Sequence, residues 1–202
     1  MNERDSWLNL EPDQQTLKDT WNALAEALVA SAQDVSPVKG EYPPHPGGHP
    51  PQSFSQPLDE KFVQEHLLDD KSHAVISANA EYLTPYRIDE ASDEISSFAG
   101  VDWTVHMPGT PIAIHHSIVV EMAVNGGSEQ YNGYAWEQYV ETLPDGSQPR
   151  VSRSGRKYSN DSMTDEDFRD ALRDFRSDER ILGIDDIEAI HAVAEYVRSD
   201  RR

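Results

Sequence analysis

The feature that most restricts the fold of this chain is a stretch of alternating apolar and polar side chains at residues 112–124. The positions of one parity are almost all apolar: Ile112, Ile114, His116, Ile118, Val120, Met122 and Val124. Because successive side chains of a strand point to opposite faces, this period of two predicts a strand with one buried face. Asn125, Gly126 and Gly127 follow directly and favour a turn. The stretch therefore predicts part of an antiparallel sheet.

Neighbouring segments extend this prediction to an antiparallel sheet of about four strands over roughly residues 101–158. Residues 101–105 alternate in the same way, and residues 134–141 are rich in aromatic side chains that favour strands. The segment 143–146 is a turn signal, because its proline fixes φ and its glycine accepts the left-handed conformation. Residues 148–158 return as the last predicted strand.

Helices are predicted near both ends of the chain. An apolar stripe at helical spacing follows Pro12, which suits a first helical position, and this helix ends by Asp34. The members of the stripe are Leu17, Trp21, Leu24 and Leu28. Two C-terminal helices are predicted to begin near Thr164 and Asp185, where clustered acidic residues favour a helix start.

The segment before the predicted sheet is less regular. Residues 59–71 predict a short helix. Residues 73–100 are ambiguous: residues 73–83 fit a strand or a helix, and residues 89–98 have a weak helical pattern. Strands followed by helices predict an α+β fold, in which the sheet packs against the N-terminal helix and the two C-terminal helices.

Proline content divides the chain into three parts. Residues 1–34 form an N-terminal arm and helix, residues 35–57 hold seven of the 13 prolines and predict a linker or extended arm, and residues 58–202 form the α+β domain. Proline cannot donate to a sheet ladder, so residues 42–51 should join neither a helix nor a central strand. Since 202 residues suit a single core, the first helix should pack on the domain and give one domain overall.

The charge balance is strongly acidic. There are 37 aspartates and glutamates against 17 lysines and arginines, which gives a formal net charge of −20, and only five of the basic residues are lysines. Such a charge strains a compact fold by self-repulsion, but at molar salt the Debye length is about 3 Å and most of that repulsion is screened. This balance is typical of halophilic archaea and their viruses, and an ordinary acidic protein is the alternative.

Composition also excludes several classes. The chain has no cysteine, so disulfides and cysteine-bound zinc are excluded. It has no apolar stretch of the ~20 residues that a membrane helix needs, so we expect no membrane partner and a cytoplasmic location, or the virion if the protein is viral. No phosphate-binding loop, zinc-protease or serine-hydrolase motif occurs, so we expect neither a catalytic motif, nor a metal, nor a cofactor.

Two histidines in the clearest strand suggest a possible site. His115 and His116 should point to opposite faces, which prevents them from ligating one ion. His116 falls on the apolar face, where we expect a buried imidazole with a hydrogen-bond partner. His115 falls on the other face with Ser117 and Glu121, which would be the site if the protein were a small enzyme. Acidic pairs such as Asp69–Asp70 and Asp185–Asp186 are attributed to general acidity and solvation.

A basic run in an otherwise acidic chain is the strongest binding signal. It contains Arg150, Arg153, Arg156 and Lys157. A two-residue turn at 145–146 would also place Glu141 opposite Arg150, so the run has an internal explanation as well. Further candidate partner-binding residues are the apolar residues of the N-terminal tip and an aromatic residue of the proline-rich arm: Trp7, Leu8, Leu10 and Tyr42.

These features favour a non-enzymatic interaction or structural subunit of a larger assembly in a halophilic setting. Its partner would be another protein or copies of itself, and a virion connector or tail-completion protein of a haloarchaeal virus would fit. One alternative is a small enzyme with its site at His115 and Glu121. Another is a regulatory or nucleic-acid-binding module that uses Arg150 to Lys157, although nucleic acid is an unlikely partner because phosphate contacts weaken steeply with salt.

Overall fold

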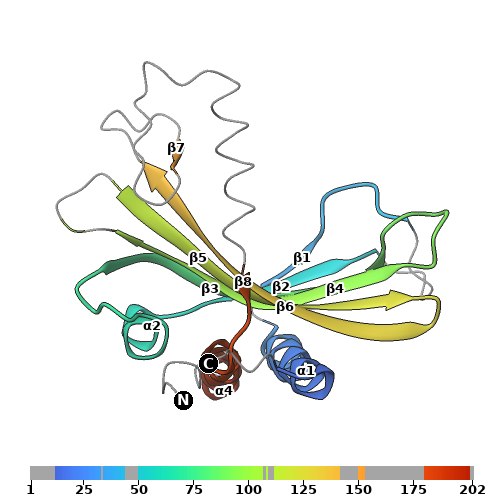
Figure 1. The fold of residues 1–202 in the computed structure, drawn as a ribbon, viewed down its shortest axis with the longest axis horizontal. Helices are drawn as coiled ribbons and strands as arrows, with labels where there is room; N and C mark the ends of the chain where they lie inside the picture. The colour runs from blue at the N-terminus through green and yellow to red at the C-terminus, as the bar shows by residue number, and fades with distance from the viewer. Residues whose placement is uncertain are drawn as a thin grey trace, which may run out of the picture.

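The computed structural model describes residues 12–32, 34–43, 50–106, 108, 112–141, 150–152 and 180–200. These residues form one antiparallel sheet and three helices (Figure 1). The strands are β1 (Asp34–Pro37), β2 (Gln52–Pro57), β3 (Ala74–Arg87), β4 (Ile95–His106), β5 (Ile112–Asn125), β6 (Ser128–Glu141), β7 (Arg150–Ser152) and β8 (Arg180–Ile181). The helices are α1 (Gln14–Ser31), α2 (Glu60–His66) and α4 (Ile184–Ser199).

The sheet is larger than the sequence predicts, and the expectation of about four strands is wrong. Strands β1 to β7 lie side by side in chain order, and β8 also pairs with β6. The predicted strands correspond to β4–β7, while β1, β2, β3 and β8 come from outside residues 101–158. The overall α+β character is confirmed.

Strand β3 was ambiguous because its ladder with β4 is irregular. The register shifts between Val75 and Ser77 and again between Leu83 and Tyr86. Each shift resets which side chains face the core, so no single period of two runs through the strand. The helix suggested by the weak pattern at 89–98 does not form. Asp89 accepts hydrogen bonds from two backbone amides of the β3–β4 connection, and β4 then begins at residue 95.

The predicted turn after the clearest strand is confirmed. Asn125 pairs with Ser128, so Gly126 and Gly127 form a two-residue hairpin loop between β5 and β6. Both glycines have positive φ, at 58° and 81°, which is the backbone of the turn that matches the twist of a two-residue hairpin. The hairpin fixes the register of both strands over their whole length.

The three helices lie on one side of the sheet, which bends so that the ends of its long strands turn away from α1 and α4 (Figure 1). Helix α1 begins after Asp13, whose side chain accepts a hydrogen bond from the Thr16 amide at 2.7 Å, and it packs against α4. The core between helices and sheet contains fully buried apolar side chains of every layer: Leu24, Val63, Ala80, Val101, Val120, Ile190, Val193 and Val197. The predicted helix near Thr164 lies outside the described residues.

The ends of the proline-rich segment join the sheet. Strand β1 pairs with β2, and β2 pairs with β3, so β2 lies between two neighbours. Pro37 and Pro57 stand at strand ends, where proline is tolerated. Tyr42 packs edge-on against Tyr86 of β3, with ring centroids 5.2 Å apart. Among the described residues, this segment therefore contacts its own domain.

No helix in the described part of the chain combines the length and the apolar character that crossing a membrane requires.

Candidate functional site

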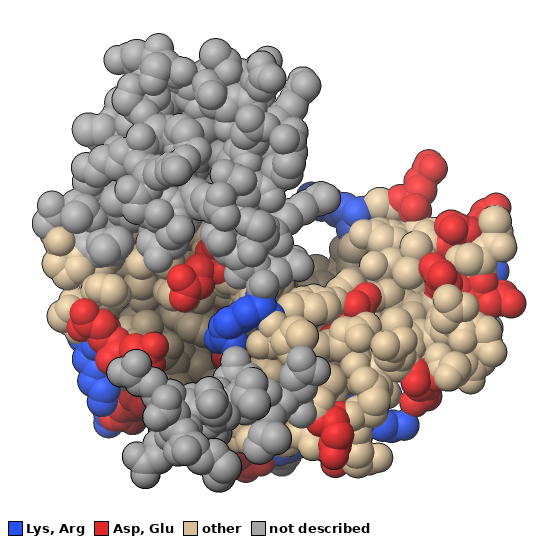
Figure 2. Space-filling model, in the orientation of Figure 1, with Lys and Arg blue, Asp and Glu red and all other residues tan. Residues whose placement is uncertain are grey.

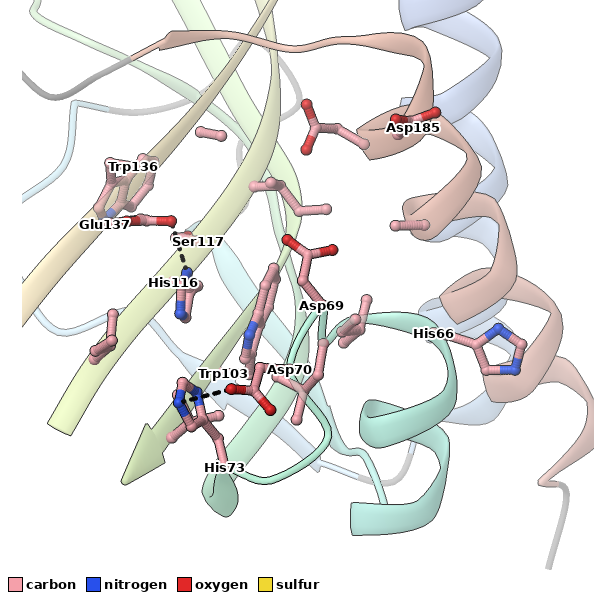
Figure 3. A pocket seen from close by; sticks show the side chains of 18 of the residues that line it. His66, Asp69, Asp70, His73, Trp103, His116, Ser117, Trp136, Glu137 and Asp185 are labelled. Atoms are coloured by element: carbon pink, nitrogen blue, oxygen red, sulfur yellow. Dashed lines mark ion pairs between the residues drawn. The ribbon is translucent and has the colours of Figure 1, made fainter. Parts of the chain in front are cut away.

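A cavity of about 780 Å³ lies between the sheet, the α2–β3 connection and the start of α4 (Figure 3). Its size falls within the range of small-molecule and peptide-side-chain pockets. Strands β4, β5 and β6 supply its inner wall, and residues 65–73 supply the wall on the side of α2. The third wall comes from Arg180 of β8 and from the first turns of α4.

The inner wall of the cavity is apolar and well packed. Buried side chains from three neighbouring strands form it: Trp103, Val105, Ile114, Ile118 and Ala135. They face the cavity because strand alternation places all of them on the helix side of the sheet. Here the gap between α2 and α4 leaves that face uncovered by a helix (Figure 1).

His116 is the main polar side chain in this otherwise apolar wall. Its ring stacks on Trp103, with ring centroids 5.1 Å apart and the planes inclined by 12°. Its Nδ1 lies 3.3 Å from Oε1 of Glu137 on β6. The hydrogen bond from His116 lowers the pKa of the Glu137 carboxyl. The prediction that His116 lies on the apolar face with a partner is confirmed, but the ring borders a cavity and is not enclosed in the core.

Trp103 contributes an unsatisfied hydrogen-bond donor to this wall. The residue is 8% exposed, and its Nε1 is buried with no hydrogen-bond partner among the described residues. A buried donor without a partner costs about 1–3 kcal/mol of desolvation. Because this atom has almost no exposed surface, it does not face the cavity, and its missing hydrogen bond is a cost to the fold.

The rim of the cavity is acidic. Six carboxylates line it against a single guanidinium, that of Arg180: Glu65, Asp69, Asp70, Glu137, Asp185 and Asp186. Asp69 and Asp185 project from opposite walls, are solvent-exposed, and have no partner among the described residues (Figure 3). In Figure 2, acidic side chains are spread over the described surface and surround a hollow in the left half of the view.

Two hydrogen-bonded units hold the rim in place. Arg180 donates to both carboxylate oxygens of Asp186, at 2.5 and 2.8 Å, and this pairing raises the pKa of the guanidinium. Asp186 also accepts from the Gly183 amide at 2.8 Å, which fixes the start of α4. On the opposite wall, Asp70 accepts from the Ser72 amide at 2.9 Å and lies 3.6 Å from His73. The Ser72 hydrogen bonds lower the pKa of Asp70.

The only rim cation is therefore already neutralised among the described residues. Arg180 is committed to Asp186, while Asp69 and Asp185 are free to pair with a group from outside. No group of three or more histidine or acidic side chains in the described ranges is arranged to hold a metal ion. An apolar wall beside exposed, unpaired carboxylates suits an organic cation with apolar parts.

The structure does not bring His115 and Glu121 together. They share the face of β5 away from the helices, but they lie six residues apart, which is roughly 20 Å along a strand. His115 Nδ1 lies 2.9 Å from Thr104 Oγ1, and burial lowers the pKa of its ring. Glu121 accepts instead from Ser96, at 3.0 Å, and from Tyr134 Oη. This face gives no shared acid–base pair between the two predicted residues.

The predicted binding residues are only partly described. The backbone register places Glu141 opposite Arg150, as the predicted turn requires, and Tyr42 lies on the surface against Tyr86. The remaining candidates fall outside the described residues: Trp7, Leu8, Leu10, Arg153, Arg156 and Lys157.

Sequence reasoning missed the cavity because its parts are far apart in the chain. The acidic pairs Asp69–Asp70 and Asp185–Asp186 were attributed to general acidity, and in a chain with 37 acidic residues neither pair stands out. The fold places both pairs on the rim of one cavity. Comparison of the chain with protein-family models, with curated proteins and with solved structures found no match.

Proposed function

We propose that this protein is a non-enzymatic interaction subunit, and that its cavity binds a basic segment of a protein partner. The observation that carries the proposal is an apolar wall surrounded by carboxylates, of which two have no partner in the described part of the chain. Each part of this arrangement matches a part of a peptide that contains arginine or lysine.

The match can be stated group by group. A guanidinium or ammonium group would lie at the rim between Asp69 and Asp185, where no described cation competes for them. The aliphatic stem of the same side chain would cover the apolar wall, as such stems do on apolar surfaces.

Exposed apolar residues beside the cavity support a protein partner. Ile181 and Ile184 are 58% and 50% exposed, and they flank the wall that carries Arg180 and Asp185. An apolar pair next to a charged pocket is typical of protein contact surfaces, where apolar anchors are surrounded by polar groups. A small cation that fills only the pocket would leave these two side chains exposed.

The salt-adapted composition is consistent with this mode of binding. In molar salt, exposed ion pairs are screened within about 3 Å, so charge alone gives little affinity. The apolar wall would still contribute there. We propose that the protein belongs to an assembly of a halophilic organism or its virus, in the cytoplasm or in a virion, for example as a connector or tail-completion protein.

Calorimetric titration of the full chain in about 0.5 M and about 2 M KCl tests the proposal. The probe is a capped peptide with three arginines in a serine–glycine background, and the reference peptide carries glutamine in place of each arginine. We expect binding of the arginine peptide only, and a loss of at least tenfold in affinity in the double variant Asp69→Asn, Asp185→Asn.

The matched control variant is Glu90→Gln, Asp93→Asn, which makes the same change in charge in the exposed β3–β4 connection, away from the cavity. It should bind the arginine peptide as the wild type does. Equal loss in both variants would mean that only the overall charge attracts the peptide, and would overturn the proposed site.

A further inference from the structure

We infer that the basic segment is the chain's own run Arg150–Lys157, supplied by a second copy, so that the protein assembles with itself through this face. This inference rests on the proposed function, because it names the partner of the same cavity.

The run is the segment of this chain with the right chemistry. It places four cations within eight residues, and no acidic residue occurs between Asp145 and Asp161. Serine and glycine separate Arg153 from Arg156, which leaves the backbone free to approach a wall closely. Other basic residues of the chain are interspersed with acidic ones, so they would bring like charge to the cavity rim.

The run also starts beside the cavity. Strand β7 pairs with β6 at residues 139–141, and Glu137, a lining residue, lies only two positions further along β6. The start of the basic run therefore pairs with the same strand that supplies part of the cavity wall.

This placement suits a two-fold dimer. A two-fold interface uses the same patch on both subunits, so a patch must carry both of the complementary groups side by side. Here the patch has an acidic cavity and the start of a basic run on the same strand. In a two-fold pair, each copy would give its run to the other's cavity, and Ile181 and Ile184 would be covered in both copies.

A charge-exchange experiment tests the inference with full chains. The cavity variant is Asp69→Lys, Asp185→Lys, and the run variant is Arg153→Glu, Arg156→Glu. In either variant alone, run and cavity carry the same sign, so we expect monomers by light scattering in about 0.5 M KCl, where charges are screened less than in molar salt. Mixed together, each run meets a cavity of opposite sign, and we expect a one-to-one complex of twice the monomer mass. The wild type alone should have that mass as well.

The control is Glu90→Lys, Asp93→Lys, which reverses two charges but keeps both run and cavity, so by itself it should have the dimer mass, as the wild type does. Circular dichroism checks that every variant is folded before the masses are compared.

The outcomes separate this inference from the proposed function. If the arginine peptide binds but the wild type is monomeric and a synthetic 151–158 peptide does not bind, the cavity has another partner and this inference is wrong. A third outcome is a monomeric wild type whose cavity binds the 151–158 peptide only in the run variant. In that case the run occupies the cavity of its own chain, and the inference that a second copy supplies the run is wrong. If no peptide binds, both proposals fail.

Discussion

Trp103 and His116 are cross-strand partners, and their rings stack nearly parallel with centroids 5.1 Å apart. The stack follows from the antiparallel register of β4 and β5, which brings the two side chains to the same face. The next pair along, His116 and Glu137, is again a register pair, of β5 and β6. Three residues from three neighbouring strands thus form a continuous row, and the hairpin loop at 126–127 sets the register of two of these strands.

The row predicts a specific pH response for Glu137. The hydrogen bond from His116 lowers the pKa of this carboxyl, so its contribution to stability is present above the ordinary glutamate pKa and is lost as the pH falls through the lowered value. Because the carboxylate is about half exposed, the loss should stay below about 1 kcal/mol. In Glu137→Gln, denaturant unfolding between pH 6 and about 3 should show a shallower fall in the free energy of unfolding than in the wild type.

Glu90→Gln is the control for that measurement, since Glu90 is exposed in the β3–β4 connection. Its pH profile should follow the wild type. A Glu137→Gln profile that also follows the wild type would show that the pair with His116 has no energetic role.

Asp102 predicts the opposite response. Burial on the face away from the helices raises the pKa of its carboxyl, so the wild type is favoured while this group is protonated and loses stability as the pH rises through the raised value. Asp102→Asn removes that loss, and its melting temperature should exceed that of the wild type at neutral pH. Below the ordinary aspartate pKa the two melting temperatures should converge. Asp93→Asn, at an exposed position, should leave the melting temperature unchanged both at neutral pH and at low pH.

The surroundings of two glycines predict different losses of stability when a single methyl group is added. A Cβ on Gly100 would lie 2.5 Å from the Ile118 carbonyl oxygen, a backbone atom that the sheet holds in place, so Gly100→Ala should cost about 3 kcal/mol or more. A Cβ on Gly133 would meet side-chain atoms of Leu182 at 2.7 Å, which can move, so Gly133→Ala should cost about 1–2 kcal/mol. Denaturant unfolding in high salt gives both values, and a reversed order would contradict this packing argument.

The net charge of −20 predicts that stability rises with salt. Screening of self-repulsion should raise the melting temperature steadily from dilute buffer to about 2 M KCl, as followed by circular dichroism. Sucrose at matched osmolality is the control, since it is excluded from protein surfaces without screening charge. An unfolding transition that is equally sharp and has the same melting temperature in dilute buffer as in about 2 M KCl would remove the basis for a halophilic origin.

Those parts of the fold that depend on local pattern could be predicted from the sequence. The alternation at 112–124 and the glycines after it gave β5 and its turn, and the leucine spacing after Pro12 gave α1. Strand β3 could not be predicted because its two irregularities interrupt the alternation. Strand β2 was hidden by flanking prolines, whose exclusion from ladders holds for strand interiors and not for strand ends.

The candidate site could be predicted only in fragments. The orientation of His116 follows from alternation, but its partner Glu137 is set by the pairing of β5 with β6, which requires the register of the hairpin. The unpaired carboxylates Asp69 and Asp185 lie on the rim of one cavity because helices α2 and α4 pack on one side of the sheet. That is a property of tertiary structure, and no local pattern in an acidic chain distinguishes them.

The packing of α1 against α4 has a consequence during synthesis. The first helix donates from Ser31 to the Val197 carbonyl, and its Ala23 carbonyl accepts from Arg198, so the earliest and the latest residues of the core meet directly. On a ribosome, α1 emerges long before α4 exists, and its apolar side has no final partner until α4 has left the exit tunnel. Nascent chains that lack α4 should therefore depend on chaperones, and cooperative folding should begin only after α4 has emerged.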